Sequence, residues 1–125
     1  YSDNITVTNN ICYNNSQSTS PNRKNGGPWA GEIANISSRN NVFKNNILVT
    51  LGTKTTYSIA CQGFNDRPST NNTWTDNITY NKSKPGDSSL SVTNTCPVPA
   101  ASNKLGQGSQ YAKQPTDFLK EPCSG

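Results

Sequence analysis

The chain has 125 residues, of which 30% are hydrophobic and 14% are charged, and this length is enough for one small domain. The low content of charged residues argues against intrinsic disorder, and the absence of histidine excludes Ser-His triads and His-ligated zinc within the chain. The net charge of +4 is spread along the sequence without a run of Lys or Arg, which argues against a nucleic-acid partner; it is compatible with an acidic polysaccharide, besides its ordinary role in solubility.

One stretch of sequence occurs three times. The copies share an apolar residue, a polar residue, Asn or Asp, Asn and then Ile, and they lie near residues 2–15, 38–51 and 69–82. Self-similarity at a period of 20–50 residues is typical of solenoids and arrays. Apolar and polar residues alternate within each copy, which predicts short β-strands, and the asparagine pair interrupts the alternation as a bend between two strands would.

The segments between the repeats contain turns and further strands. Residues 16–32 carry many turn formers and no apolar period, which predicts a long surface loop that contains Trp29. This tryptophan either packs back on the solenoid or faces a ligand. Residues 57–61 and 89–96 alternate again and are predicted to be strands.

The repeats predict an all-β fold, a parallel β-helix of about three coils over residues 1–96. Each coil contains two or three short strands, and apolar side chains stack on their counterparts one coil away. Residues 97–125 change character and are predicted to be an irregular C-terminal cap, because the last coil of a solenoid exposes apolar surface and unpaired strand edges.

Three rows of side chains are expected inside the helix. Two rows are apolar: Val7, Phe43 and Trp74, and Ile11, Ile47 and Ile78. The third is an internal ladder of Asn10, Asn46 and Asn77, in which each side-chain amide donates to the carbonyl oxygen of the next. Because Asn77 is part of an Asn-x-Thr sequon, the ladder also predicts that this sequon is buried and carries no glycan.

The four cysteines include no CxxC pair, which argues against a zinc site and indicates disulfides in an exported protein. Pairing of Cys12 with Cys61 and of Cys96 with Cys123 is the more local arrangement, and we favour it. Stacked coils would instead place Cys61 and Cys96 roughly 4.8 Å apart, which also suits a bridge.

The asparagine motifs, at residues 9–15, 45–47 and 76–81, resemble those of secreted right-handed parallel β-helix proteins, the superfamily of pectate, alginate and chondroitin lyases. The tail is similar to a closing segment common in these proteins, although Lys120-Glu121-Pro122 lacks the Gly of its final turn. The resemblance implies that the chain is the C-terminal coils and cap of a longer protein, whose remaining N-terminal coils would be its partner.

Lyases of this superfamily use a Lys or Arg base, usually with calcium held by Asp and Glu side chains, because the enolate that forms must be stabilised. The seven acidic residues form no evident cluster in sequence, so no metal site is assigned, although one carboxylate with carbonyl ligands is enough to bind calcium. The candidate sugar-contacting residues, each of which has surface charge or packing as its simpler explanation, are Trp29, Arg39, Lys44, Tyr80 and Lys82.

The expected function is therefore that of a secreted carbohydrate-active protein, a polyuronate lyase whose catalytic residues are unknown and lie outside this chain. The alternative is a non-enzymatic extracellular solenoid, an adhesin or a fibre subunit. No membrane span is present in the sequence. Asn14, Asn35 and Asn81 are the sequons expected to accept glycans.

Overall fold

The computed structural model describes residues 2–15, 30–51, 57–83 and 90–112. The predicted all-β class is confirmed, since these residues form parallel strands and one short 3-10 helix. The elements are β1 (Thr6–Thr8), β2 (Ile11–Tyr13), β3 (Gly31–Ile36), β4 (Val42–Lys44), β5 (Ile47–Thr50), β6 (Tyr57–Gln62), β7 (Thr73–Thr75), β8 (Ile78–Asn81), β9 (Leu90–Val92) and η3 (Ser109–Tyr111).

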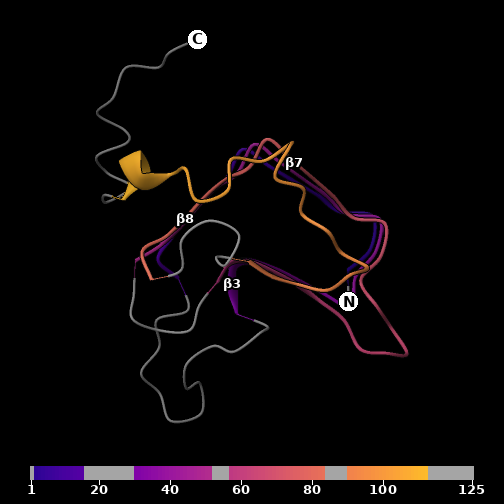
Figure 1. Cartoon of the computed structure of the whole chain (residues 1–125). Coiled ribbons are helices and arrows are strands. Elements are labelled where there is room, and N and C mark those ends of the chain that lie inside the picture. The colour runs from indigo at the N-terminus through magenta and orange to yellow at the C-terminus, as the bar shows by residue number, and fades with distance from the viewer. Residues whose placement is uncertain (1, 16–29, 52–56, 84–89, 113–125) are drawn as a thin grey trace.

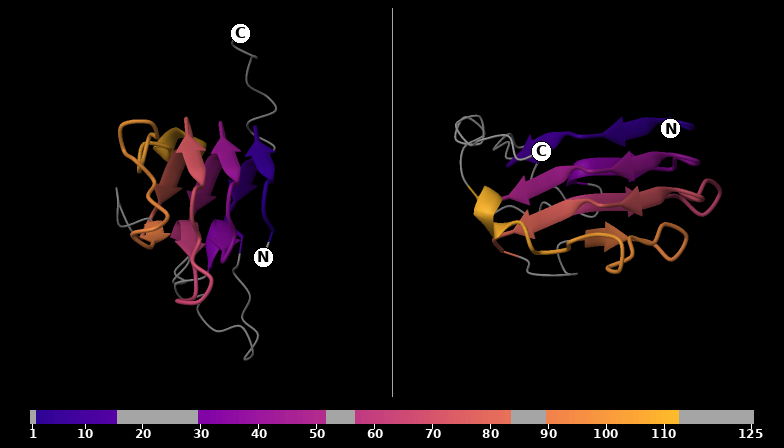
Figure 2. Two further views of the ribbon diagram at one scale, coloured as in Figure 1. Left: turned by 90° about the vertical axis from the view of Figure 1, so that its right-hand side faces the viewer. Right: turned by 90° about the horizontal axis from the view of Figure 1, so that it is seen from above.

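The strands form three parallel sheets of three strands each within the described ranges. The sheets have the orders β1-β4-β7, β2-β5-β8 and β3-β6-β9. In Figure 1 the strands of each sheet lie behind one another, and the labels β7, β8 and β3 mark three sides of the outline. Figure 2 shows the same strands from the side, stacked in register. This arrangement is that of a parallel β-solenoid.

The register of the sheets follows the sequence repeats. Val7 of β1 lies beside Phe43 of β4, which lies beside Trp74 of β7. The rings of Phe43 and Trp74 stack with their centroids 3.9 Å apart, and both side chains are buried. The predicted inner row of Val7, Phe43 and Trp74 is therefore confirmed, with Val7 packed against the core at the end of the stack.

The predicted inner row of isoleucines is wrong. Ile11, Ile47 and Ile78 do align, but Ile11 is 48% exposed and its two partners are only half-buried. The reason is the period of two in a strand. Because the second asparagine of each pair points inward, the isoleucine that follows it points outward. The next residue in each strand then packs inside, as the fully buried Leu48 does.

The two asparagines of each pair have different structural roles. The first member adopts the left-handed backbone conformation, with φ of 60° at Asn9, 56° at Asn45 and 55° at Asp76. Asn and Asp tolerate this conformation better than other residues with a Cβ atom. This residue turns the chain, and the second member then enters the core, where Asn46 and Asn77 are fully buried.

The predicted asparagine ladder is confirmed by its hydrogen bonds. The Nδ2 atom of Asn10 donates to Oδ1 of Asn46 at 3.1 Å, and Nδ2 of Asn46 donates to Oδ1 of Asn77 at 3.0 Å. The backbone N–H groups of Asn10 and Asn46 donate to the same two oxygens, each at 3.1 Å. One Oδ1 atom of each repeat therefore binds both the side chain and the main chain of the asparagine one repeat earlier.

The segment after β9 continues the ladder, which the sequence repeats did not predict. Oδ1 of Asn103 accepts hydrogen bonds from both the backbone N–H and Nδ2 of Asn77. Next to it, Lys104 forms a parallel bridge with Ile78, and Val98 packs into the core. Residues 98–108 thus cover the edge of β8, as expected of a cap; the domain boundary at residue 96 stays a prediction, and residues 113–125 lie outside the described ranges.

The disulfide joins Cys61 and Cys96, with 5.9 Å between their Cα atoms. The local pairing that we favoured is therefore wrong, and the stacked pairing is correct. The physical reason is a turn after β9: the N–H of Thr93 donates to the carbonyl of Cys61, and the N–H of Cys96 donates to the carbonyl of Thr93. The turn brings Cys96 back onto Cys61. Cys12 is a free thiol, and Cys123 lies outside the described ranges.

The different roles of Asn45 and Asn46 predict different mutational effects. Asn46→Ala removes the Nδ2 donor to the carbonyl of Val7 and the Oδ1 acceptor of the Asn10 N–H and Nδ2 groups, and should lower the free energy of unfolding by at least about 2 kcal/mol. Asn45→Gly keeps the left-handed backbone conformation, so the free energy of unfolding should change by less than about 0.5 kcal/mol. Asn45→Ala should lower the free energy of unfolding by about 1 kcal/mol. Urea denaturation measures all three. Equal losses for Asn46→Ala and Asn45→Gly would contradict these roles.

Candidate functional site

The five predicted sugar-contacting residues do not form one site. Trp29 lies outside the described residues. Lys44 ends β4 and is exposed, whereas Tyr80 lies half-buried on β8, in a different sheet. Lys82 is exposed just after β8, where its N–H donates to the carbonyl of Thr50. The structure therefore distributes these side chains over different sides of the solenoid.

Arg39, by contrast, is part of a cluster of charged side chains. Its NH2 group lies 3.5 Å from Oδ2 of Asp3, and its backbone N–H donates to Oδ1 of the same carboxylate at 2.8 Å. The NH2 group of Arg67 lies 3.4 Å from the same Oδ2 atom. Two guanidinium groups therefore share one carboxylate oxygen. We call Asp3, Arg39 and Arg67 the arginine cluster.

The local fold explains how Arg67 reaches this cluster. Phe64 and Arg67 form an antiparallel bridge that closes a turn after β6. The turn is held against the bend at Ser37, because the N–H of Phe64 donates to its Oγ at 3.3 Å and Nε of Arg67 donates to its carbonyl at 2.9 Å. Gly63 is required there, since a Cβ atom at this position would lie 2.6 Å from the backbone N of Ser69.

The cluster has a net positive charge and is accessible to solvent. The backbone N–H of Arg39 is the main cause that holds the pKa of Asp3 below its ordinary value, and the two guanidinium charges add to it against the cost of desolvation. The side chains of Arg39, Arg67 and Asp3 are 45%, 34% and 28% exposed. Surface ion pairs contribute about 0–1 kcal/mol to stability, so the cluster is poorly explained as a stabilising device. Its geometry suits binding of a second carboxylate, which guanidinium groups recognise by paired hydrogen bonds.

Arg67 was not predicted from the sequence. It lies in a turn outside the three repeats, so the repeat alignment carries no signal for it. Only the fold of the 62–69 turn against Ser37 reveals that Arg67 and Arg39 reach the same aspartate.

Glu32 is a second charged residue in an unusual environment. It is the second residue of β3 and is only 8% exposed. Its carboxylate accepts hydrogen bonds from the backbone N–H of Asn15 at 2.8 Å, from Nδ2 of Asn15 at 2.8 Å and from Oγ1 of Thr50 at 3.2 Å. Desolvation by burial raises the pKa of Glu32, and these hydrogen bonds offset the rise only in part.

The remaining acidic residues do not assemble into a metal site. Within the described ranges, no three His, Cys, Asp or Glu side chains lie close enough to hold one ion. Asp66 and Asp76 are exposed and lie in separate turns. Calcium binding therefore stays a prediction that rests on the resemblance alone.

The sequons differ in their accessibility. The predicted burial of Asn77 is confirmed, with an exposed fraction of 0%. Asn35 and Asn81, however, are also buried, at 4% and 3% exposed, and Nδ2 of Asn35 donates to the carbonyl of Ser38. We withdraw both as glycan acceptors, because an N-linked sugar needs its Nδ2 atom at the surface. Asn14 is half-buried and stays a prediction.

Comparison of the chain with protein-family models, with curated proteins and with solved structures finds no match. Among the residues that the structure describes, no helix has the length and apolar character needed to cross a membrane.

The environment of Glu32 predicts a specific pH dependence of stability. Because its folded-state pKa is raised above the ordinary value of 4.5, the folded protein retains a proton that the unfolded chain releases. The free energy of unfolding should therefore fall as the pH rises from 4.5 through the raised pKa. Glu32→Gln should remove this part of the decline, which denaturation between pH 4 and pH 8 measures. An unchanged slope in Glu32→Gln would show that Glu32 is not the group responsible.

Proposed function

We propose that the chain is the C-terminal part of a secreted, right-handed parallel β-helix protein of the carbohydrate-active type, with about three coils and an irregular cap. The strand order supports the coils, since the chain visits the three parallel sheets in the same sequence each time. Right-handed connections between parallel strands are by far the commonest. The buried disulfide supports export, because disulfides persist in oxidising compartments.

We further propose that this part binds an acidic polysaccharide through the arginine cluster. The observation that carries the proposal is the position of the Arg39 and Arg67 guanidinium groups within 3.5 Å of one carboxylate oxygen. A sugar carboxylate that approaches the cluster meets two cations and one anion. Such a site suits a polyuronate, in which every residue carries a carboxylate.

The proposed activity of the whole protein is polyuronate lysis. A lyase must abstract the proton α to the uronate carboxyl, and cationic groups that neutralise this carboxyl lower the barrier. Arg39 and Arg67 would hold a uronate next to the reacting sugar, and the catalytic residues would lie on coils N-terminal to this chain.

A non-enzymatic extracellular solenoid, an adhesin or fibre subunit, is the second candidate. The observation that favours it is the apolar surface at the N-terminal end of the stack, where Ile5 is 45% and Ile11 48% exposed. Such a surface is typical of a site where protein binds protein. An assay of the intact protein for unsaturated uronides released from pectate and alginate distinguishes the two: absorbance gain supports the lyase, and no gain together with filament assembly supports the fibre subunit.

The binding proposal predicts the effect of removing the two arginines. The double variant Arg39→Gln, Arg67→Gln should bind polygalacturonate or alginate at least tenfold more weakly, because a hydrogen bond to a charged group contributes about 1.5–3 kcal/mol. Lys104→Gln is the charge control: it removes one positive charge from an exposed position in the cap, so the loss per charge removed is compared with that of the double variant. Calorimetric titration at fixed ionic strength measures the affinities. Equal losses in variant and control, or equal binding to a neutral glucan, would refute a specific site.

A further inference from the structure

The hydrogen-bond ladder repeats one pattern at each buried asparagine. Oδ1 accepts the N–H and Nδ2 of the asparagine in the preceding repeat, as in Asn46 with Asn10. Nδ2 also donates a second hydrogen bond to a backbone carbonyl of the preceding repeat. The residue that carries this carbonyl lies three positions before the ladder asparagine of that preceding repeat. Asn46 donates in this way to Val7, and Asn77 donates to Phe43.

Asn10 has only half of this pattern. Within the described part of the chain no group donates to its Oδ1 atom. Its second Nδ2 hydrogen bond goes to the carbonyl of Thr8 in its own repeat, at 3.1 Å. The local bond replaces the one that Asn46 and Asn77 make to a preceding repeat. Asn10 is therefore an interior ladder residue that lacks its preceding neighbour.

A second row of hydrogen bonds is incomplete at the same end. The N–H of Ser2 donates to Oγ of Ser38 at 3.0 Å, and the N–H of Ser38 donates to Oγ of Ser69 at 3.1 Å. Oγ of Ser2 accepts no such bond from the described residues. Each of these serines precedes the ladder asparagine of its repeat by eight positions, as Ser2 precedes Asn10.

The main chain has open donors at this end as well. The N–H groups of Val42 and Ile47 donate to the carbonyls of Ile5 and Asn10 in the preceding repeat, each at 2.8 Å. Thr6 and Ile11 occupy the equivalent places in β1 and β2. No described strand pairs with β1 or β2 on this side. We call the outer edges of β1 and β2, with Ser2 and Asn10, the open end.

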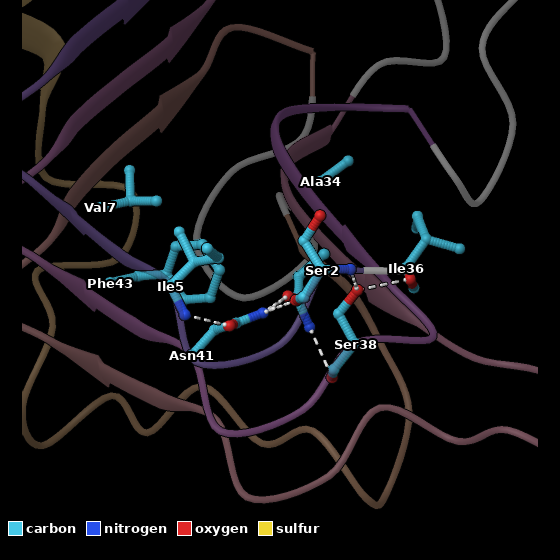
Figure 3. A pocket seen from close by; sticks show the side chains of 9 residues that line it. Ser2, Ile5, Val7, Ala34, Ile36, Ser38, Asn41 and Phe43 are labelled. Atoms are coloured by element: carbon cyan, nitrogen blue, oxygen red, sulfur yellow. Dashed lines mark hydrogen bonds between the residues drawn. The ribbon is translucent and has the colours of Figure 1, made fainter.

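Apolar surface lies beside these polar groups. A hollow of about 340 Å³ is lined by side chains that include Ile5, Val7, Ala34 and Phe43. Figure 3 shows Ile5 and Val7 on the same side as the Phe43 ring, with the Asn41 side chain accepting from the N–H of Ile5 and donating to the carbonyl of Ser2. A strand that covered the open end would bury Ile5 and complete the rows at Ser2 and Asn10 at the same time.

The opposite end of the ladder is closed. Nδ2 of Asn103 donates to the carbonyls of Trp74 and Pro99, each at 2.9 Å, so its amide is satisfied within the third repeat and the cap. The N–H of Gly108 covers the carbonyl of Thr79. Among the described residues, the open end of one molecule therefore finds no free ladder amide at the far end of another. Two open ends that face each other would bring the unfilled oxygens of two Asn10 residues together, with no donor between them.

We propose that the open end binds one further asparagine-pair repeat, which lies N-terminal to Ser2 in the intact protein. Its main chain donates an N–H to Oγ of Ser2, and an asparagine eight residues later donates its N–H and Nδ2 to Oδ1 of Asn10. An apolar residue of this repeat packs on Ile5. At the equivalent position of the second repeat, Oδ1 of Asn41 accepts a backbone N–H from the first repeat, and the side chain of Ile5 has no such acceptor. This inference rests on the proposed function, because it identifies what the N-terminal partner presents to this chain.

The test adds such a repeat to the full chain. A copy of residues 38–68 replaces Tyr1. The copy of Asn46 then lies 31 residues before Asn10, just as Asn46 lies 31 residues before Asn77. In the copy, Asn41→Ile supplies the apolar residue and Cys61→Ala avoids an unpaired thiol. Backbone amide exchange of Thr6 and Ile11 should slow at least tenfold relative to the parent chain. The matched control carries Asn46→Ala in the copy and should lose most of this protection.

Two results would overturn the proposal: no slowing at Thr6 and Ile11, or equal slowing in the Asn46→Ala control. A dimer of the parent chain that protects Ile11 in a concentration-dependent manner would also overturn it, in favour of a second copy as occupant. Polygalacturonate titration of the same fusion separates this inference from the proposed function. Loss of polyuronate binding with retained protection refutes the sugar site alone.

Discussion

The asparagine ladder is the interaction on which the rest of the structure depends. In a chain with so little apolar residue content, the bends between strands must be placed without a large hydrophobic core. A buried amide makes this possible because it offers one acceptor and two donors, and the bend exposes backbone groups that need partners. Asn46 and Asn77 bind the bend before and the bend after them. Adjacent repeats are thereby fixed in one register, which in turn stacks Phe43 on Trp74.

The ladder also has a direction. The Oδ1 atoms of Asn46, Asn77 and Asn103 accept from the preceding repeat. Among the described residues, the row therefore begins with an unfilled acceptor at Asn10 and ends with a satisfied amide at Asn103. The cap therefore does more than cover apolar surface, since it supplies the last member of the polar row. Within the described residues, the two ends of the ladder are therefore chemically different.

Sequence periodicity predicted the features that repeat and missed those that depend on turns. The offsets between Asn10, Asn46 and Asn77 were sufficient to predict the parallel register and the buried ladder. The same reasoning failed for Ile11 and its partners, because two consecutive residues of a strand cannot both face inward. Cys96 and Arg67 were not predicted correctly because each is positioned by a turn outside the repeats. Asn103 has no repeat context, so its place in the ladder follows only from the way residues 98–108 cross the end of the stack.

Exchange of the side-chain amide protons, resolved by NMR for individual asparagines of the unmodified chain, tests the ladder most directly. We expect slow exchange for the Nδ2 protons of Asn46, Asn77 and Asn103, because these amides are buried and each donates two hydrogen bonds. Exchange should be fast for the exposed Asn45. It should be faster for Asn10 than for Asn77, because Asn10 is exposed although its Nδ2 donates to Thr8 and Asn46. Exchange of Asn46 or Asn77 as fast as that of Asn45 would contradict the ladder, and protection of Asn10 equal to that of Asn77 would contradict the exposure of Asn10 at the open end.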